Sequence, residues 1–304
     1  LSMPAFMLQN VFQCFFVTAE RPKLGLTVIV LAGVTNIILD FLFIAVFSWG
    51  LAGAAFATVC GECVGGLLPL VYFGRENASP FRLGKTKLYW NILGKTCTNG
   101  SSELMTNLSS SIVNTLFNFQ LMHFAGEDGV AAYGTLMYVN FIFVAIFLGY
   151  SIGSAPIVSY HYGARNSEEL KNLLTKSLKM IGVWGVALFA LAQMIASPLA
   201  RIFVGYDPDL FDLTRHGFRI FCLAFLINGF NIFGSSFFTA LNNGPLSALI
   251  SFLRTLIFQI AAVLLLPLLF GIMGIWWSIN AAELLTLCVT LMLLFTMRGR
   301  YHYA

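Results

Sequence analysis

Charged residues are scarce in this chain of 304 residues. Asp, Glu, Lys and Arg together make up 10% of the sequence, whereas 58% is apolar and the mean hydropathy is +0.83. A soluble domain usually carries about 25% charged residues, so the composition excludes a water-soluble enzyme and a disordered chain. The formal net charge of +4 is too small and too scattered for a nucleic-acid-binding surface, and we expect no nucleic-acid partner.

Cysteine and the signatures of enzyme chemistry are also sparse. The six Cys residues are spread along the chain as small apolar residues and form no disulfide framework. Cys60-Gly-Glu-Cys63 has metal-site spacing but no second pair, and the sequence lacks a nucleophile elbow, a phosphate loop and a His/carboxylate metal motif. We therefore predict a protein that is not an enzyme and holds no metal or other cofactor.

Long apolar runs are what the sequence has in abundance. A bilayer core about 30 Å thick requires roughly 20 apolar residues in a helix. Nine such runs cover residues 1–19, 24–47, 51–74, 98–124, 129–160, 177–204, 216–241, 246–270 and 272–297. They are too long for alternating barrel strands, and helices satisfy their own backbone in lipid. The sequence predicts an all-α integral membrane protein, a polytopic bundle of nine transmembrane helices.

Basic residues gather at alternate ends of these runs. They follow the first, third, fifth and ninth runs, whose ends all fall on one side of the membrane. These 13 residues are Arg21, Lys23, Arg75, Arg82, Lys85, Lys87, Lys95, Arg165, Lys171, Lys176, Lys179, Arg298 and Arg300. On the opposite side, acidic residues offset Arg201, Arg215 and Arg219. The positive-inside rule then predicts that the richer side, and the C-terminus with it, is cytoplasmic.

The sequence also resembles itself at an offset of 221 residues. The aligned positions are Phe16, Thr18 and Ala19 with Phe237, Thr239 and Ala240, Gly50 and Gly53 with Gly271 and Gly274, and Glu62 with Glu283. Matched hairpins keep the same orientation, which indicates a parallel repeat related by an axis along the membrane normal.

The repeat predicts the domain organisation. We expect residues 1–83 to be the last three helices of an N-lobe with the start of a linker, and residues 84–304 to be a six-helix C-lobe. The chain starts at Leu1, inside an apolar run and without an initiator Met or a signal-peptide n-region. We therefore expect three further helices upstream, in a 6+6 two-lobe transporter of about 440 residues with pseudo-twofold symmetry.

Four polar residues of the second and third runs are predicted to lie together. Asp40 and Thr58 are each nine residues from Trp49, at the centre of the hairpin, and Asn36 and Glu62 are each thirteen away. Each pair therefore shares one depth, and the i, i+4 spacing places each couple on one helix face. Such oxygen groups suit a hard cation or a transferable proton. The alternative is that Asn36 and Thr58 only bond neighbouring helices and that Glu62 is a neutral packed acid.

A second polar group lies in the predicted C-lobe. Gln259 and Glu283 are each twelve residues from Gly271, and Arg254 shares the helix of Gln259. Arg254 can pair with Glu103, near the cytoplasmic end of its run, or with Glu283. Two interpretations stay open here, a substrate site and an ion pair that only joins helices. Asn228 and Asn231 flank a Gly-rich stretch, which favours helix packing over ligand contact.

Several motifs resemble the MATE (multidrug and toxin extrusion) transporters. They are Arg21-Pro-Lys23, Asn36-Ile-Ile-Leu-Asp40 and Gly50-Leu-Ala-Gly53-Ala-Ala-Phe-Ala-Thr58 in the first half, with Tyr162-Gly-Ala-Arg-Asn166 and Phe238-Thr-Ala-Leu-Asn-Asn-Gly244 in the second. The resemblance runs from the fourth family helix to the twelfth, and the DinF-like bacterial branch is the most similar.

The resemblance implies a V-shaped pair of six-helix bundles with alternating access. It implies export of organic, often cationic, compounds in exchange for protons or sodium ions, by a monomer in the bacterial inner membrane. Asn36, Asp40 and Thr58 match the family's N-lobe cation site, whose first-helix Asp lies in the expected upstream segment. Glu103 matches a C-lobe acid of another branch, but the run with Asn228 lacks the second acid, so we expect no C-lobe sodium site.

A different transport class is the alternative function. A flippase for a lipid-linked oligosaccharide on a similar two-lobe plan needs several basic residues deep in its cavity to hold a diphosphate. Arg254 alone lies deep in a run, which favours the drug exporter. The aromatic-rich runs then provide the apolar wall that a lipophilic cation requires.

Overall fold

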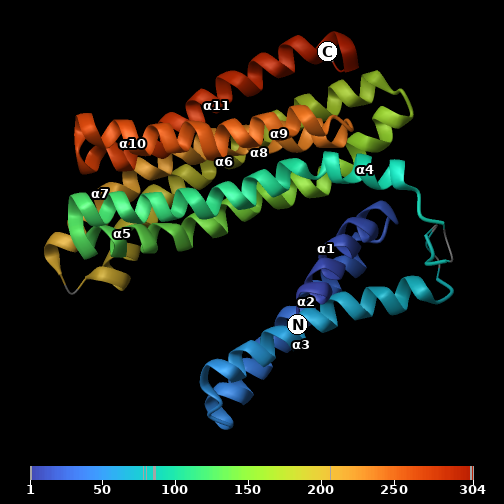
Figure 1. Ribbon diagram of the computed structural model, residues 1–304, viewed down its shortest axis with the longest axis horizontal. Helices are drawn as coiled ribbons and strands as arrows, with labels where there is room; N and C mark the ends of the chain where they lie inside the picture. Colours follow the sequence, from blue (N-terminus) through green and yellow to red (C-terminus); the bar gives the residue numbers. More distant parts are fainter. Residues whose placement is uncertain are drawn as a thin grey trace. The chain divides into compact units, whose positions relative to one another are not determined.

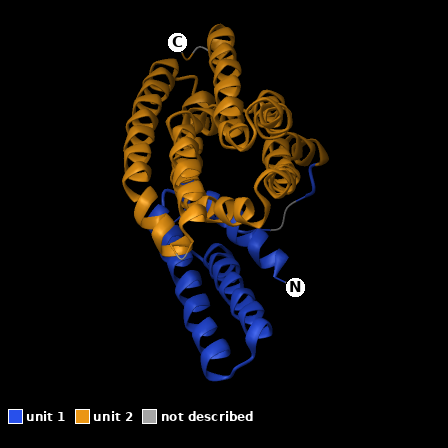
Figure 2. Ribbon diagram, turned by 90° about the vertical axis from the view of Figure 1, so that its left-hand side faces the viewer, with its two compact units in different colours: residues 1–89 blue, residues 90–304 orange. Residues whose placement is uncertain are grey.

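The computed structural model describes residues 2–77, 79, 81–84, 87–205, 207–301 and 303, and among them it contains helices and no strands (Figure 1). The chain divides into two compact units, unit 1 over residues 1–89 and unit 2 over residues 90–304 (Figure 2). The predicted boundary at residues 83 and 84 lies slightly before this division.

Unit 1 is a three-helix assembly. Its helices are α1 (Met3–Thr18), α2 (Pro22–Asp40), continued by the π-helix η1 (Phe41–Val46), and α3 (Gly50–Gly74). Pro22 opens α2, where its fixed φ suits the first helical turn and its missing N–H costs nothing. Both α1 and α2 pack against α3.

Glycines on one face of α3 allow this close packing. A Cβ at Gly66 would lie 2.6 Å from the Ala5 carbonyl oxygen of α1, and one at Gly61 would lie 3.0 Å from the Cβ of Asn36 on α2. Small residues let helix backbones approach in lipid, where no hydrophobic force drives helices together. Gly61 and Gly66 therefore allow α2 and α1 to pack closely against α3.

Unit 2 contains the remaining helices. They are α4 (Trp90–Asn99), α5 (Ser101–Gly163), α6 (Ser167–Val204), α7 (Pro208–Phe221), η2 (Cys222–Ala224), α8 (Phe225–Ala240), α9 (Gly244–Phe252), the π-helix η3 (Leu253–Phe258), α10 (Gln259–Phe270) and α11 (Ile272–Tyr301). Segments η2 and η3 continue their neighbours, so that α7 to α8 and α9 to α10 each form one long helical stretch.

The element α5 is two antiparallel helices joined at Gly126. This glycine has φ 64° and ψ −152°, outside the helical region. The Phe117 and Tyr133 rings, on either side of it, stack with centroids 5.1 Å apart, and the Tyr133 hydroxyl donates to Asn114 Oδ1 at 2.9 Å. The predicted separation of runs 98–124 and 129–160 is thereby confirmed.

All nine predicted runs coincide with helical stretches among the described residues. Seven helices there are long and apolar enough to cross a membrane. One of the seven, α5, contains two of the predicted runs. The remaining run corresponds to α1, which has 16 residues and is not among the seven. The prediction of an all-α polytopic membrane protein is confirmed.

Three similar turns end α1, α5 and α8. In each, an N–H donates to a carbonyl five residues earlier at 2.9 Å: Arg21 to Phe16, Asn166 to His161 and Asn243 to Phe238. The residue before each donor has a positive φ, as in a Schellman motif. The motifs around residues 162–166 and 238–244 therefore mark helix ends.

These turns correct the alignment of the repeat. Arg21 and Asn243 are 222 residues apart, whereas Gly50 and Gly271, both with positive φ, are 221 apart. The residue equivalent to Phe16 is therefore Phe238, one position after the predicted Phe237. The reason is that a nonhelical Ser48 precedes Gly50, whereas α10 remains helical up to Gly271.

Large apolar side chains are exposed on both units. Leu51 is 90% exposed, and Leu268 and Leu269 are each 75% exposed. Buried Phe and Trp side chains, among them Phe117, Phe238 and Trp276, form the interior of unit 2. Apolar surface of this extent is a liability in water, whereas in a bilayer it faces hydrocarbon.

Candidate functional site

The α2–α3 hairpin carries the first predicted group. Asn36 and Asp40 lie on α2 and are half-buried, as is Glu62 on α3, whereas Thr58 is exposed. The close approach of the two helices at Asn36 and Gly61 places Asn36 next to the turn of α3 that carries Glu62.

No hydrogen bond joins these four side chains in the described part of the chain. Thr58 Oγ1 donates to the Ala54 carbonyl of its own helix at 3.0 Å. Asp40 Oδ1 and Glu62 Oε2 are buried oxygen atoms without a hydrogen-bond partner among the described residues. A buried acceptor without a donor is costly, so both carboxyl groups are suited to take up a proton or a cation.

The π-helix η1 begins directly after Asp40. Its wider turn is seen in the bond from the Phe47 N–H to the Leu42 carbonyl, at 2.9 Å and five residues apart. Single π-helical turns are frequent at functional sites. Sequence patterns gave no indication of this one.

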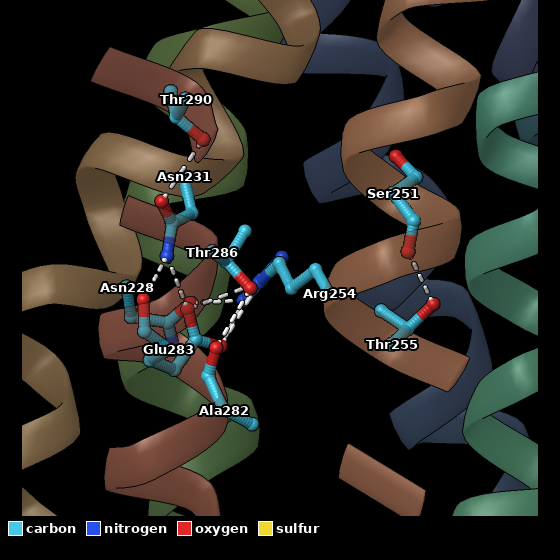
Figure 3. Close-up of polar contacts among 9 residues, drawn as sticks. All are labelled: Asn228, Asn231, Ser251, Arg254, Thr255, Ala282, Glu283, Thr286 and Thr290. Atoms are coloured by element: carbon cyan, nitrogen blue, oxygen red, sulfur yellow. Dashed lines mark hydrogen bonds and ion pairs between the residues drawn. The ribbon is translucent and has the colours of Figure 1, made fainter. Parts of the chain in front are cut away.

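The second predicted group is organised around an ion pair. Arg254, on η3, lies 2.9 Å from Glu283 Oε1 through Nη2, and its Nε donates to Oε1 at 2.9 Å and to Oε2 at 3.1 Å. The Glu283 side chain, on α11, is 2% exposed and that of Arg254 is 15% exposed. Figure 3 shows the guanidinium reaching across to the carboxylate from a separate helix.

Two asparagines of α8 complete this network. Asn231 Nδ2 donates to Glu283 Oε2 at 2.7 Å and to the Glu283 carbonyl at 2.9 Å. Its Oδ1 accepts from Thr290 at 3.2 Å, and Asn228 Oδ1 accepts from Arg254 Nη2 (Figure 3). The sequence favoured helix packing over ligand contact for both residues, and their hydrogen bonds join α8 to α11 and η3. Two amides three residues apart in one membrane span were a signal for a shared polar face.

Glu103 and Gln259 lie outside this network. Glu103 is exposed in the first turn of α5 and makes no ion pair with Arg254. Of the two partners considered for Arg254, the structure selects Glu283. Gln259 is half-buried at the start of α10 and forms no side-chain hydrogen bond within the described residues.

Two cavities lie away from both groups. One, of about 490 Å³, is lined by His161, Arg165, Arg300 and Tyr301 among others, and the other, of about 460 Å³, by Arg21 and residues near it in unit 1. Among the described residues, no cluster of His, Cys, Asp or Glu is arranged to hold a metal ion.

A helical membrane protein with ionisable groups inside its spans is typical of transporters. The MatE family model matches residues 104–265, more than half of the sequence. The chain therefore belongs to the MatE family, whose members are transporters and not enzymes.

Similar proteins extend this match to nearly the whole chain. The multidrug export protein MepA of Staphylococcus aureus (strain MSSA476) is 22% identical over 301 residues, covering 99% of this chain and 66% of MepA. The chain thus spans slightly less than two thirds of that relative.

Solved structures show the same fold. A MATE transporter crystallised in complex with MaL6 superposes with a TM-score of 0.91 at 20% identity, over 98% of this chain and 67% of that one. An outward-facing multidrug resistance MATE family transporter superposes with a TM-score of 0.85 at 21% identity, over 93% of this chain and 64% of that one.

Proposed function

We propose that this chain is part of an exporter of organic, often cationic, compounds that uses an inward flow of protons or sodium ions. The observation that carries the proposal is the α2–α3 hairpin, where Asp40 and Glu62 each hold a buried oxygen without a hydrogen-bond partner among the described residues. The similarity to multidrug export proteins supports the substrate class.

Asp40 is the central residue of the proposed coupling site. A carboxylate inside a membrane span costs a few kcal/mol unless it is neutralised. Binding a proton or Na⁺ removes that cost, and release of the cation restores the charge that attracts a cationic substrate. The Thr58 hydroxyl donates its proton to the Ala54 carbonyl, so its oxygen remains able to act as an acceptor, and the Asn36 amide offers a further oxygen.

Glu62 is proposed as the second acid of the site. It shares the depth of Asn36 by sequence spacing, and its neighbour Gly61 contacts Asn36. Two acids on one hairpin allow one to bind the cation while the other tunes its affinity. Glu103 and Gln259 stay candidate substrate contacts of the second lobe.

The flippase alternative gains no support from the second group. A diphosphate requires free basic side chains deep in a span, and the guanidinium of Arg254 is engaged by Glu283 and Asn228. An occupied guanidinium is a poor anchor for a second anion.

We further propose that the protein acts as a monomer in the bacterial inner membrane with a cytoplasmic C-terminus. The uneven distribution of basic residues supports this orientation. Gly299→Cys, introduced after replacement of the native cysteines, is labelled with a membrane-impermeant thiol reagent in right-side-out and everted vesicles. Preferential labelling in everted vesicles is expected, and preferential labelling in right-side-out vesicles would contradict a cytoplasmic C-terminus.

The coupling proposal is tested by Asp40→Asn in everted vesicles that contain the complete protein. Drug accumulation driven by an imposed proton or sodium gradient should be abolished, because a neutral amide neither takes up a proton nor balances the charge of Na⁺. Glu168→Gln, an exposed acid at the start of α6, is the matched control and should transport normally. Unchanged gradient-driven transport by Asp40→Asn would remove Asp40 from the mechanism.

A further inference from the structure

The carboxylate of Glu283 has every oxygen engaged by donors from its own unit. Oε1 accepts from Arg254 Nε and lies 2.9 Å from Arg254 Nη2 in the ion pair, and Oε2 accepts from Asn231 and from Arg254 Nε. Among the described residues Arg254 is its only charged partner. The guanidinium therefore supplies both the positive charge and the coordination that a bound cation would supply.

The repeat provides an internal comparison. Glu62 is the residue of unit 1 that corresponds to Glu283, and its Oε2 is buried without a partner among the described residues. With the offset of 221 or 222 residues, Arg254 corresponds to Gly33 or Ala32. Among the described residues, the same acidic position thus has an arginine partner in unit 2 and no basic partner in unit 1.

Exchange of a free cation at Glu283 would be unfavourable. An Arg side chain stays protonated in proteins, so its charge is permanent. A proton or Na⁺ that replaced it would leave a guanidinium that is largely buried and unpaired, which is strongly destabilising. The pair also joins α11 to η3, and the asparagines join both to α8.

We propose that Arg254 is a built-in cation that permanently occupies the carboxylate site of the second lobe and thereby confines cation exchange to the first lobe. Arg254 is in this sense a residue that determines where the cation binds and how many are exchanged. The statement about the first lobe rests on the proposed function, whereas the statement about Glu283 does not.

The first experiment removes the built-in cation. Purified wild-type protein, Arg254→Ala and the double variant Arg254→Ala/Glu283→Gln are compared for ²²Na⁺ binding, and for thermal unfolding against NaCl and against pH, with choline chloride keeping the ionic strength constant. We expect Arg254→Ala to gain one additional cation, seen as bound Na⁺ or as a new protonation step in the pH dependence. The double variant should lose that gain. Equal cation and pH dependence in Arg254→Ala and the double variant would overturn the proposal.

A second experiment remains decisive if Arg254→Ala fails to fold. Arg254→Met/Glu283→Gln replaces the pair by neutral groups of similar size, a change that buried ion pairs often tolerate. It should bind the same number of cations per molecule as the wild type. Loss of a bound cation in this variant would show that Glu283 itself exchanges cations, contrary to the proposal.

These measurements count cations and do not require transport. Failure of the Asp40→Asn test would therefore refute the proposed coupling site and leave the result at Arg254 interpretable. Conversely, a cation-exchanging Glu283 would refute the built-in cation without affecting the role of Asp40.

Discussion

Arg254 and Glu283 form a buried ion pair between η3 and α11, with Nη2 and Oε1 2.9 Å apart. The pair closes a network that extends through Asn231 to Thr290, so that it connects α8, η3 and α11. In lipid, where helices gain little from hydrophobic association, such polar contacts determine which helix faces meet.

Breaking one half of this pair should destabilise the protein more than removing both halves. Glu283→Gln leaves Arg254 without its counter-ion, and loss of one partner of a buried pair typically costs about 3–5 kcal/mol. Arg254→Met/Glu283→Gln removes both charges and should recover most of that loss. Unfolding in detergent, followed for both variants and for Arg254→Met, completes a double-mutant cycle, and additive effects would contradict a coupled pair.

Asn231 should be the most sensitive amide of the network. The residue is 0% exposed and bonds to Glu283 and Thr290, so Asn231→Ala takes a partner from three buried polar groups. We expect a loss of about 1–3 kcal/mol in unfolding free energy. Asn107→Ala is the control, because Asn107 is exposed and bonds only to its own helix. Equal losses in both variants would argue against a special role for the network.

The sequence was sufficient to predict where the hairpins turn and how deep the acidic residues lie in their spans. Gly50 and Gly271 were matched by spacing, and both have a positive φ, 56° and 57°, because a sharp turn there requires a residue without a side chain. Apolar runs of the length of a bilayer are a strong signal that requires no knowledge of packing.

The partners of the polar residues were not predictable in the same way. Equal distance from a turn gives a residue's depth, whereas contact also depends on the rotation of each helix about its axis. The π-helical turns η1 and η3, which no sequence pattern indicated, change that rotation next to Asp40 and at Arg254. The bonding partners of Asn231 were therefore not named from the sequence, and Arg254 was left between Glu103 and Glu283.

The contact of α1 with α3 should tolerate no side chain at Gly66. A Cβ there would lie 2.6 Å from the Ala5 carbonyl oxygen, so Gly66→Ala must move two helices apart, at a cost of about 1–3 kcal/mol. Gly33→Ala, also inside a helix but with open space around it, should be neutral or stabilising, since alanine favours helix. The unfolding temperatures of both variants are compared with that of the wild type. An unchanged unfolding temperature for Gly66→Ala would show that α1 and α3 do not depend on close contact at Gly66.

The bend at Gly126 should likewise depend on glycine. Its φ of 64° and ψ of −152° lie in a region that only glycine occupies readily, and other residues held in such regions cost about 1–3 kcal/mol. Gly126→Ala should therefore lower the unfolding temperature and increase proteolysis near the bend that joins the two helices of α5. Gly134→Ala lies inside the second of these helices with no atom near the added Cβ, so it controls for the loss of glycine itself. Equal stability of both variants would contradict this prediction. It would mean that residue 126 can adopt an ordinary conformation without disturbing the two helices of α5.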